Sequence, residues 1–141
     1  MRKLYTKIFS EFVPEAKWVR EEVFIHEQGF SYDYDEMDDV SVHIVGFEGD
    51  KPIAACRVFE SEKEGTFILG RLAVKKVCRN RGVGGEIVDA AKEYAKSIGG
   101  GYLILHSQLQ AKGFYEKLGF REYGEVEYEE DCPHIWMKTE L

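Results

Sequence analysis

The sequence has few cysteines, no long apolar run and fewer basic than acidic residues. Its three cysteines, Cys56, Cys78 and Cys132, are odd in number and far apart, which argues against a disulfide framework and a paired-cysteine zinc site. No apolar run approaches the roughly 18 residues that a bilayer-spanning helix needs, and the opening "MRKLYTKIFSEF" lacks the apolar core of a signal peptide. We therefore expect reduced thiols, no membrane partner and a cytoplasmic location.

Acidic residues outnumber basic ones. Lysine and arginine together number 19 against 26 aspartates and glutamates, which gives a net charge of −7 at pH 7. Sequence-independent binding to nucleic acid depends on Lys and Arg displacing counterions along phosphates, so we expect no nucleic-acid partner. No two of the histidines and carboxylates have convincing metal-ligand spacing, and we expect no bound metal.

The length of the chain suits one domain. With 141 residues, 44% of them hydrophobic, a single core can bury roughly 70% of the unfolded surface without disulfides or metals. No repeat, low-complexity tract or linker divides the sequence. We therefore predict a single domain over residues 1–141.

The first half of the chain predicts a helix and an antiparallel meander. A strand is expected over 4–9, and apolar residues recur near helical spacing from Pro14 to Glu27. Two β-branched, apolar runs over 42–47 and 53–59 flank the turn "EGDKP", and a third run over 66–74 follows "SEKEG". These three runs predict consecutive antiparallel strands.

The second half begins with a helix. Apolar residues from Val83 to Ile98 mark one helical face, and the glycines that follow end it before a short strand over 102–106. A strand, a helix and a strand in this length imply a right-handed crossover and a parallel pair. A short helix over 111–118 and two closing strands over 120–129 and 134–138 complete a mixed α/β sheet flanked by helices.

The stretch "LAVKKVCRNRGVGGEIV" runs from a predicted strand through basic residues and glycines into a helix. The first amides of a helix have no carbonyl partner and carry the positive end of its dipole, so a glycine turn there can bind an anion. Lys75, Lys76, Arg79 and Arg81 add positive charge that suits several phosphates. The turn is not a Walker loop, because the Gly-Lys-Ser/Thr ending is missing. It is not a dinucleotide-binding fingerprint either, because Ile87 stands where that motif has its third glycine. The alternative is a plain helix entry with solvated basic residues.

Two segments carry a family resemblance. "RNRGVG" after "RLAV", together with "AKGFYEKLGF" about thirty residues later, resembles the two signature segments of the GNAT superfamily of acyl-CoA-dependent N-acyltransferases. "VFIHEQGF", "HSQLQA" and "CPHIWMK" extend the resemblance over nearly the whole chain and are similar to the small ElaA-like branch. The resemblance implies a GNAT-like mixed sheet, with an N-terminal antiparallel meander and central strands that splay apart.

The resemblance also implies a site for acetyl-CoA. In the family a bulge splays the strand at 66–74 from the strand at 102–106, pantetheine lies between them, and the pyrophosphate sits on the glycine turn. The residues expected to bind the coenzyme are Leu72, Ala73, Val74, Arg79, Arg81, Gly82, Val83, Gly84, Gly85, Gln108 and Phe114. This chain has Lys76 and Cys78 where the family often has Pro and an aromatic residue, and Gln108 where it often has Asn.

The chemistry implied is direct attack of an amine on the thioester. The backbone amide of Val74 would stabilise the oxyanion, and Tyr115 would give a proton to the leaving thiolate. The alternative for Tyr115 is an aromatic core residue beside Phe114.

The general base is less clearly marked. Glu27, at the end of the first helix, could accept the amine proton directly or through water, or could be a solvated carboxylate. His106 and His134 are candidates for lining the acceptor site, with sheet-end histidines of purely structural role as the alternative.

The acceptor is an unidentified small amine or peptide. The acidic stretch "DYDEMDD", 33–39, is either a solvated loop or a frame that attracts a cationic amine. The predicted function is acetyl transfer from acetyl-CoA to a primary amine in a ternary complex, by a monomer or homodimer. A non-catalytic acyl-CoA-binding sensor on the same fold is the alternative, and an acyl group other than acetyl stays open.

Overall fold

A mixed β-sheet forms the centre of the fold. The computed structural model describes residues 3–141, so the first two residues of the predicted domain lie outside the described part. Seven strands in this part pair in the order β1-β2-β3-β4-β5-β7-β6. Their bounds are β1 Leu4–Phe9, β2 Val42–Glu48, β3 Lys51–Glu60, β4 Thr66–Val74, β5 Tyr102–Gln108, β6 Arg121–Glu129 and β7 Cys132–Glu140. Only the β4–β5 pair is parallel, which confirms the predicted meander and crossover.

The helices also lie where the sequence places them. Helix α1, Pro14–Arg20, continues as a π-helix over Glu21–Glu27, and together they span the single helix predicted. Helix α2 covers Val83–Ser97, and helix α3 covers Lys112–Lys117 after a short 3-10 turn. Among residues 3–141, no helix combines the length and the apolar character needed to cross a bilayer.

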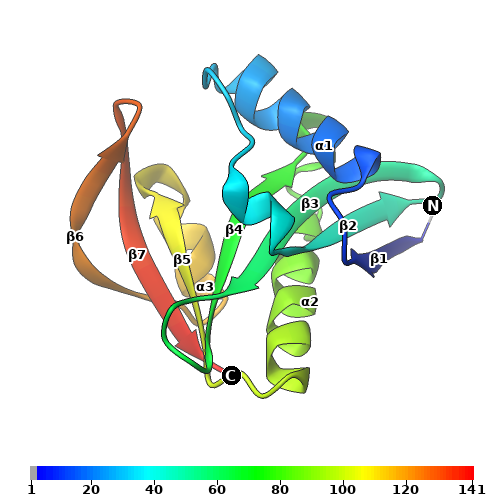
Figure 1. Ribbon diagram of the computed structural model, residues 1–141. Coiled ribbons are helices and arrows are strands. Elements are labelled where there is room, and N and C mark those ends of the chain that lie inside the picture. The colour runs from blue at the N-terminus through cyan, green and yellow to red at the C-terminus, as the bar shows by residue number, and fades with distance from the viewer. Residues whose placement is uncertain (1–2) are drawn as a thin grey trace.

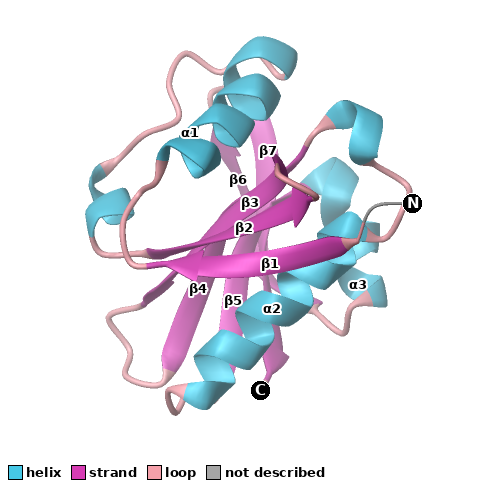
Figure 2. Cartoon of the chain, turned by 90° about the vertical axis from the view of Figure 1, so that its right-hand side faces the viewer, coloured by secondary structure: helices cyan, strands magenta, loops and turns pink. Residues whose placement is uncertain are grey.

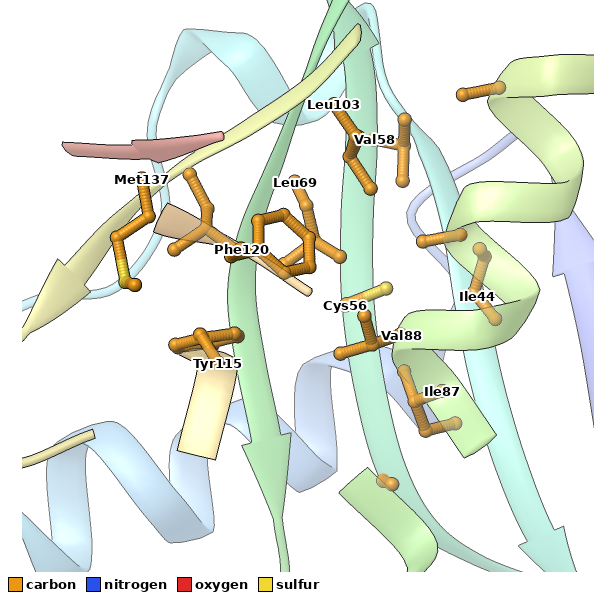
Figure 3. Close-up of a cluster of buried hydrophobic side chains, with 14 of the residues drawn as sticks. Ile44, Cys56, Val58, Leu69, Ile87, Val88, Leu103, Tyr115, Phe120 and Met137 are labelled. Atoms are coloured by element: carbon orange, nitrogen blue, oxygen red, sulfur yellow. The ribbon is translucent and has the colours of Figure 1, made fainter. Parts of the chain in front are cut away.

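Helices α1 and α2 cover opposite faces of the sheet (Figures 1 and 2). Alternation along the strands separates two cores, because neighbouring residues of a strand point to opposite faces. Ile44 packs in the core under α2, and Val45 packs in the core under α1. Figure 3 shows the first of these cores, in which Tyr115 from α3 lies near Phe120.

The central strands pair over a short length and then part. Strand β4 is paired with β5 from Thr66↔Tyr102 to Leu69↔Leu105, and both strands continue beyond that point without further pairing to each other. On its other edge β4 has a register shift against β3, and Arg71 at that point has a φ of 52°. The bulge adds local twist, and β4 and β5 diverge toward the top of Figure 1.

The acidic segment ahead of β2 is held against the sheet by arginines. Arg20 from α1 is fully buried and donates from Nε to Asp33 (2.8 Å) and from Nη1 to Asp38 (2.7 Å). Arg57 from β3 donates to Asp35 (2.5 Å) and Asp38 (3.0 Å).

This arrangement corrects one expectation. The segment 33–39 is not a fully solvated loop, because Asp33 and Asp38 are only 3% and 4% exposed and Asp33, Asp35 and Asp38 all pair with arginines. Burial disfavours the charged form, yet hydrogen bonds from Arg20 lower the pKa of Asp38 to about 2. The segment therefore presents far less negative charge than its sequence suggests.

Asp38→Asn should destabilise the fold, because it leaves the buried Arg20 cation without one of its two carboxylates. We expect the free energy of unfolding at pH 7 to fall by about 3 kcal/mol, measured by urea denaturation. The folded-state pKa of Asp38 is depressed, so wild type should lose this contribution as the pH falls from about 4 toward about 2. The exposed neighbour is the matched control: Asp39→Asn should stay within about 0.5 kcal/mol of wild type. Equal stability of the two variants would contradict the account.

Candidate active site

A cleft of about 950 Å³ opens where β4 and β5 part. One end of it is lined by the glycine turn before α2, and the other by β5, β7 and the segment around Tyr32. The predicted site residues that line it are Leu72, Val74, Arg79, Gly82, Val83, Gly84, Gly85, His106, Gln108, Phe114, Tyr115 and His134. The structure thus brings together residues from both signature segments and both candidate histidines.

The glycine turn offers free backbone donors to the cleft. Helix α2 begins at Val83, Gly82 takes a left-handed φ of 79°, and no side chain among residues 3–141 caps the first amides. At Gly84 a Cβ atom would lie 3.0 Å from Cζ of Phe114, so only glycine lets the ring approach the turn without a shift. Unpaired amides at the N-terminus of a helix, here one of 15 residues, can bind an anion.

The two arginines near this turn are already paired. Arg79 donates from Nη1 and Nη2 to the two oxygens of Glu27, both at 2.6 Å, and from Nε to the carbonyl of Val74 at 3.0 Å. Arg81 pairs with Glu48 at 3.1 Å. Arg79 therefore links the helix end at Glu27 to the edge of β4, instead of being the mobile charge that the sequence suggested.

The amide of Val74 faces the open side of β4. The next residue, Lys75, donates its N–H to Ile53 across the β3–β4 pair (2.9 Å), and N–H groups of successive strand residues point in opposite directions. The Val74 carbonyl points the same way as the Val74 N–H, and it accepts a hydrogen bond from Arg79 rather than from β3. The Val74 N–H is therefore directed toward the gap between β4 and β5.

Tyr115 lies at the base of the cleft. Its ring packs edge-on against Phe114 (5.0 Å between centroids) and Phe120 (5.8 Å), and only 8% of the residue is exposed. Burial raises the pKa of the phenol, so the hydroxyl keeps its proton at neutral pH. Tyr115 therefore agrees with both interpretations from the sequence, since it packs in the core and is also one of the residues that line the cleft.

The two histidines lie together on the opposite wall. His106 stacks on Trp136 (4.7 Å between centroids) and lies 5.0 Å from the ring of His134. Glu129 Oε2 lies 3.0 Å from Nε2 of His134 and 3.7 Å from Nδ1 of His106. This cluster comes from β5, β6 and β7.

Comparison with known proteins agrees with this geometry. The model of the Acetyltransferase (GNAT) domain matches residues 11–141. The chain belongs to the GNAT acetyltransferase family. *Bacillus subtilis* YjcF, described as an uncharacterized N-acetyltransferase, is 39% identical over 131 residues, which cover 91% of this chain and 92% of YjcF.

Solved structures share the fold of this GNAT acetyltransferase. *Escherichia coli* ElaA has a TM-score of 0.82 at 28% identity over 99% of both chains, which agrees with the resemblance found in the sequence. A *Bacillus subtilis* acetyltransferase in complex with CoA has a TM-score of 0.76 at 20% identity over 99% of both chains. At 20% identity, the likeness to the acetyltransferase in complex with CoA shows a shared fold and nothing more.

Glu27 is placed differently from the other candidate residues of the GNAT site. Its carboxylate is held by Arg79, and the hydrogen bonds from Arg79 lower its pKa. A carboxylate with a lowered pKa is a weaker base. Its role as the base stays a prediction, and the pairing with Arg79 gives it a second role in fixing the start of the glycine turn.

The end of the GNAT cleft away from the glycine turn includes residues that the sequence did not single out. Arg57, Arg71 and Trp136 line it together with Asp33 and Asp35. Arg57 lies opposite Gly70 on β4, and Trp136 lies opposite His106 on β5. Only the folded structure shows that the two residues line the same cleft. Gln108 lies at the mouth, where its Nε2 donates to Gln28 at 2.9 Å.

Proposed function

We propose that this GNAT acetyltransferase transfers an acetyl group from acetyl-CoA to a primary amine by direct attack in a ternary complex. The observation that carries the proposal is that one cleft holds three features: the open edge of β4, the uncapped amides before α2 and the protonated hydroxyl of Tyr115. Together they provide hydrogen bonds for an extended chain, an anion site and a proton donor.

The cleft fits coenzyme A as a substrate. Its pantetheine part carries amides, which match the unpaired edge of β4 over Leu72, Ala73 and Val74 beyond the last β4–β5 pair. Its pyrophosphate is an anion, which matches the turn at Gly82, Val83, Gly84 and Gly85. The complex of a fold neighbour with CoA supports this assignment.

In this proposal, different residues of the cleft act on different atoms of the reacting groups. The amine nitrogen attacks the thioester carbon, and the Val74 N–H donates to the oxygen as negative charge develops there. The C–S bond breaks as the C–N bond forms, Tyr115 gives its proton to the departing sulfur, and the amine nitrogen loses one proton to a base or to water. A buried phenol with a raised pKa is protonated at pH 7 and can act as this acid.

A screen of primary amines with acetyl-CoA tests the function, with release of free thiol as the readout. Turnover with any amine above the hydrolysis background supports transfer. Tight binding of acetyl-CoA without turnover across amines of different charge would favour the alternative, a non-catalytic acyl-CoA sensor.

Gly84→Asp should weaken binding of coenzyme A at least about tenfold, or about 1.4 kcal/mol, because it places bulk and negative charge at the anion site. Isothermal titration calorimetry measures the affinity. Gly85→Asp is a second variant with more room, since a Cβ there would lie 3.7 Å from Leu118. Gly101→Asp, where a Cβ would be 3.8 Å from the carbonyl of Gly65, is the matched control far from the turn. Unchanged affinity in folded Gly84→Asp and Gly85→Asp would refute the anion site.

Tyr115→Phe removes one hydroxyl with little change in volume. We expect kcat to fall on the order of 100-fold, while the affinity for coenzyme A stays within about twofold. Tyr94→Phe makes the same change in a half-buried tyrosine of α2 outside the cleft and should leave kcat unchanged. If both variants turn over at the wild-type rate when chemistry is rate-limiting, another group protonates the thiolate.

A further inference from the structure

His106 occupies the first position of β5 beyond its pairing with β4. Leu105 is the last residue paired with that strand, and the side chain of His106 lines the cleft. On its other edge β5 pairs with β7, where Trp136 lies directly opposite His106. The imidazole is therefore fixed at the point where the two central strands part.

The ring is held by packing. His106 stacks on Trp136 with 4.7 Å between ring centroids and 23° between ring planes, and 17% of its side chain is exposed. A side chain ordered in this way loses little further entropy when a substrate binds. Its position next to the open edge of β4 suits a group that acts on a reaction occurring there.

The charged groups that face His106 come from β6 and β7. Glu127 Oε1 lies 3.2 Å from Nε2, although the angle is not that of a hydrogen bond, and Glu129 Oε2 lies 3.7 Å from Nδ1. His134 on β7 is the third neighbour. Across the cleft, Arg57 and Arg71 already pair with carboxylates of the acidic segment.

His134 has a different environment from His106. Its Nδ1 lies 2.9 Å from the carbonyl oxygen of Cys132, and its Nε2 lies 3.0 Å from Glu129. Both partners can accept a hydrogen bond, so the nitrogen that carries the proton has an acceptor within reach in either tautomer. Both nitrogens of His134 thus contact groups within the protein, which makes His134 a positioning residue for Glu129.

We propose that His106 is the general base of the transfer, with Glu129 and His134 as positioning residues. The proposal rests on the proposed function. As the C–N bond forms, one proton leaves the amine for Nδ1 of His106, because Nε2 is enclosed, and Tyr115 gives its proton to the sulfur as the C–S bond breaks. Release of the proton from His106 to water and reprotonation of Tyr115 restore both groups.

The electrostatics agree with this role. Burial lowers the pKa of His106, while Glu129 and Glu127 oppose the change, so the ring is neutral and able to accept a proton at pH 7. Once protonated, it has Glu127 and Glu129 nearby to stabilise the cation. The hydrogen bonds from Arg79 instead make Glu27 the weaker candidate.

His106→Gln tests the assignment with an amine that wild type acetylates in the screen above. We expect kcat at saturating substrates to fall on the order of 100-fold or more, with coenzyme A affinity within about twofold of wild type. In wild type kcat should decline as the pH falls below 6.5, the ordinary value for histidine, and this decline should be absent in the variant. The exposed His26 lies outside the cleft, so His26→Gln is the matched control and should behave as wild type.

Glu129→Gln tests whether Glu129 stabilises the charged form of His106 or only supports the fold. Removing the carboxylate disfavours the imidazolium, so the decline of kcat should move to lower pH. NMR titration of the His106 ring in the coenzyme A complex gives a readout that needs no acceptor, and it should show a neutral ring at pH 7.

A ring that is still protonated at pH 7 would overturn the proposal. Wild-type kcat and an unchanged pH profile in His106→Gln would overturn it as well. If Glu27→Gln then lost the decline of kcat at low pH, Glu27 would be the base. Failure of wild type to bind coenzyme A would instead refute the proposed function.

Discussion

The parting of β4 and β5 after Leu69 and Leu105 is the constraint on which the rest of the structure depends. If the parallel pair continued, the N–H of Val74 would have a partner on β5 and the cleft would close. The bulge at Arg71 bends β4 away. Ion pairs from Arg71 to Asp33 (3.1 Å) and Asp35 (3.2 Å) connect this bulge to the acidic segment, so the network that stabilises the fold also fixes the shape of the cleft.

The two ends of the cleft differ in their electrostatics. The end at α2 offers backbone amides and a helix dipole, while the other end carries charged side chains that largely neutralise one another. Three arginines balance three aspartates around Arg57, and Glu27 balances Arg79. The net charge of −7 therefore says little about the charge inside the cleft.

Periodicity and turn residues predicted the strands, the helices and the parallel pair, because these features depend on residues close in sequence. The glycine turn was predictable for the same reason. The pairing of Glu27 with Arg79 could not be predicted from the sequence, because 52 positions separate the two residues and only the packed structure brings them together. The environment of His106 likewise depends on the β5–β7 register, and local sequence patterns do not determine which residues of distant strands lie opposite each other.

The central claim is that one cleft, opened by the parting of β4 and β5, binds coenzyme A along the free edge of β4 and at the turn before α2. Amide chemical shifts recorded while the ¹⁵N-labelled protein is titrated with coenzyme A test this claim directly. The account predicts the largest saturable changes at Val74, Gly82, Gly84 and Gly85, with small changes along β1 and β6. Changes centred elsewhere, or none at saturating coenzyme A, would contradict it.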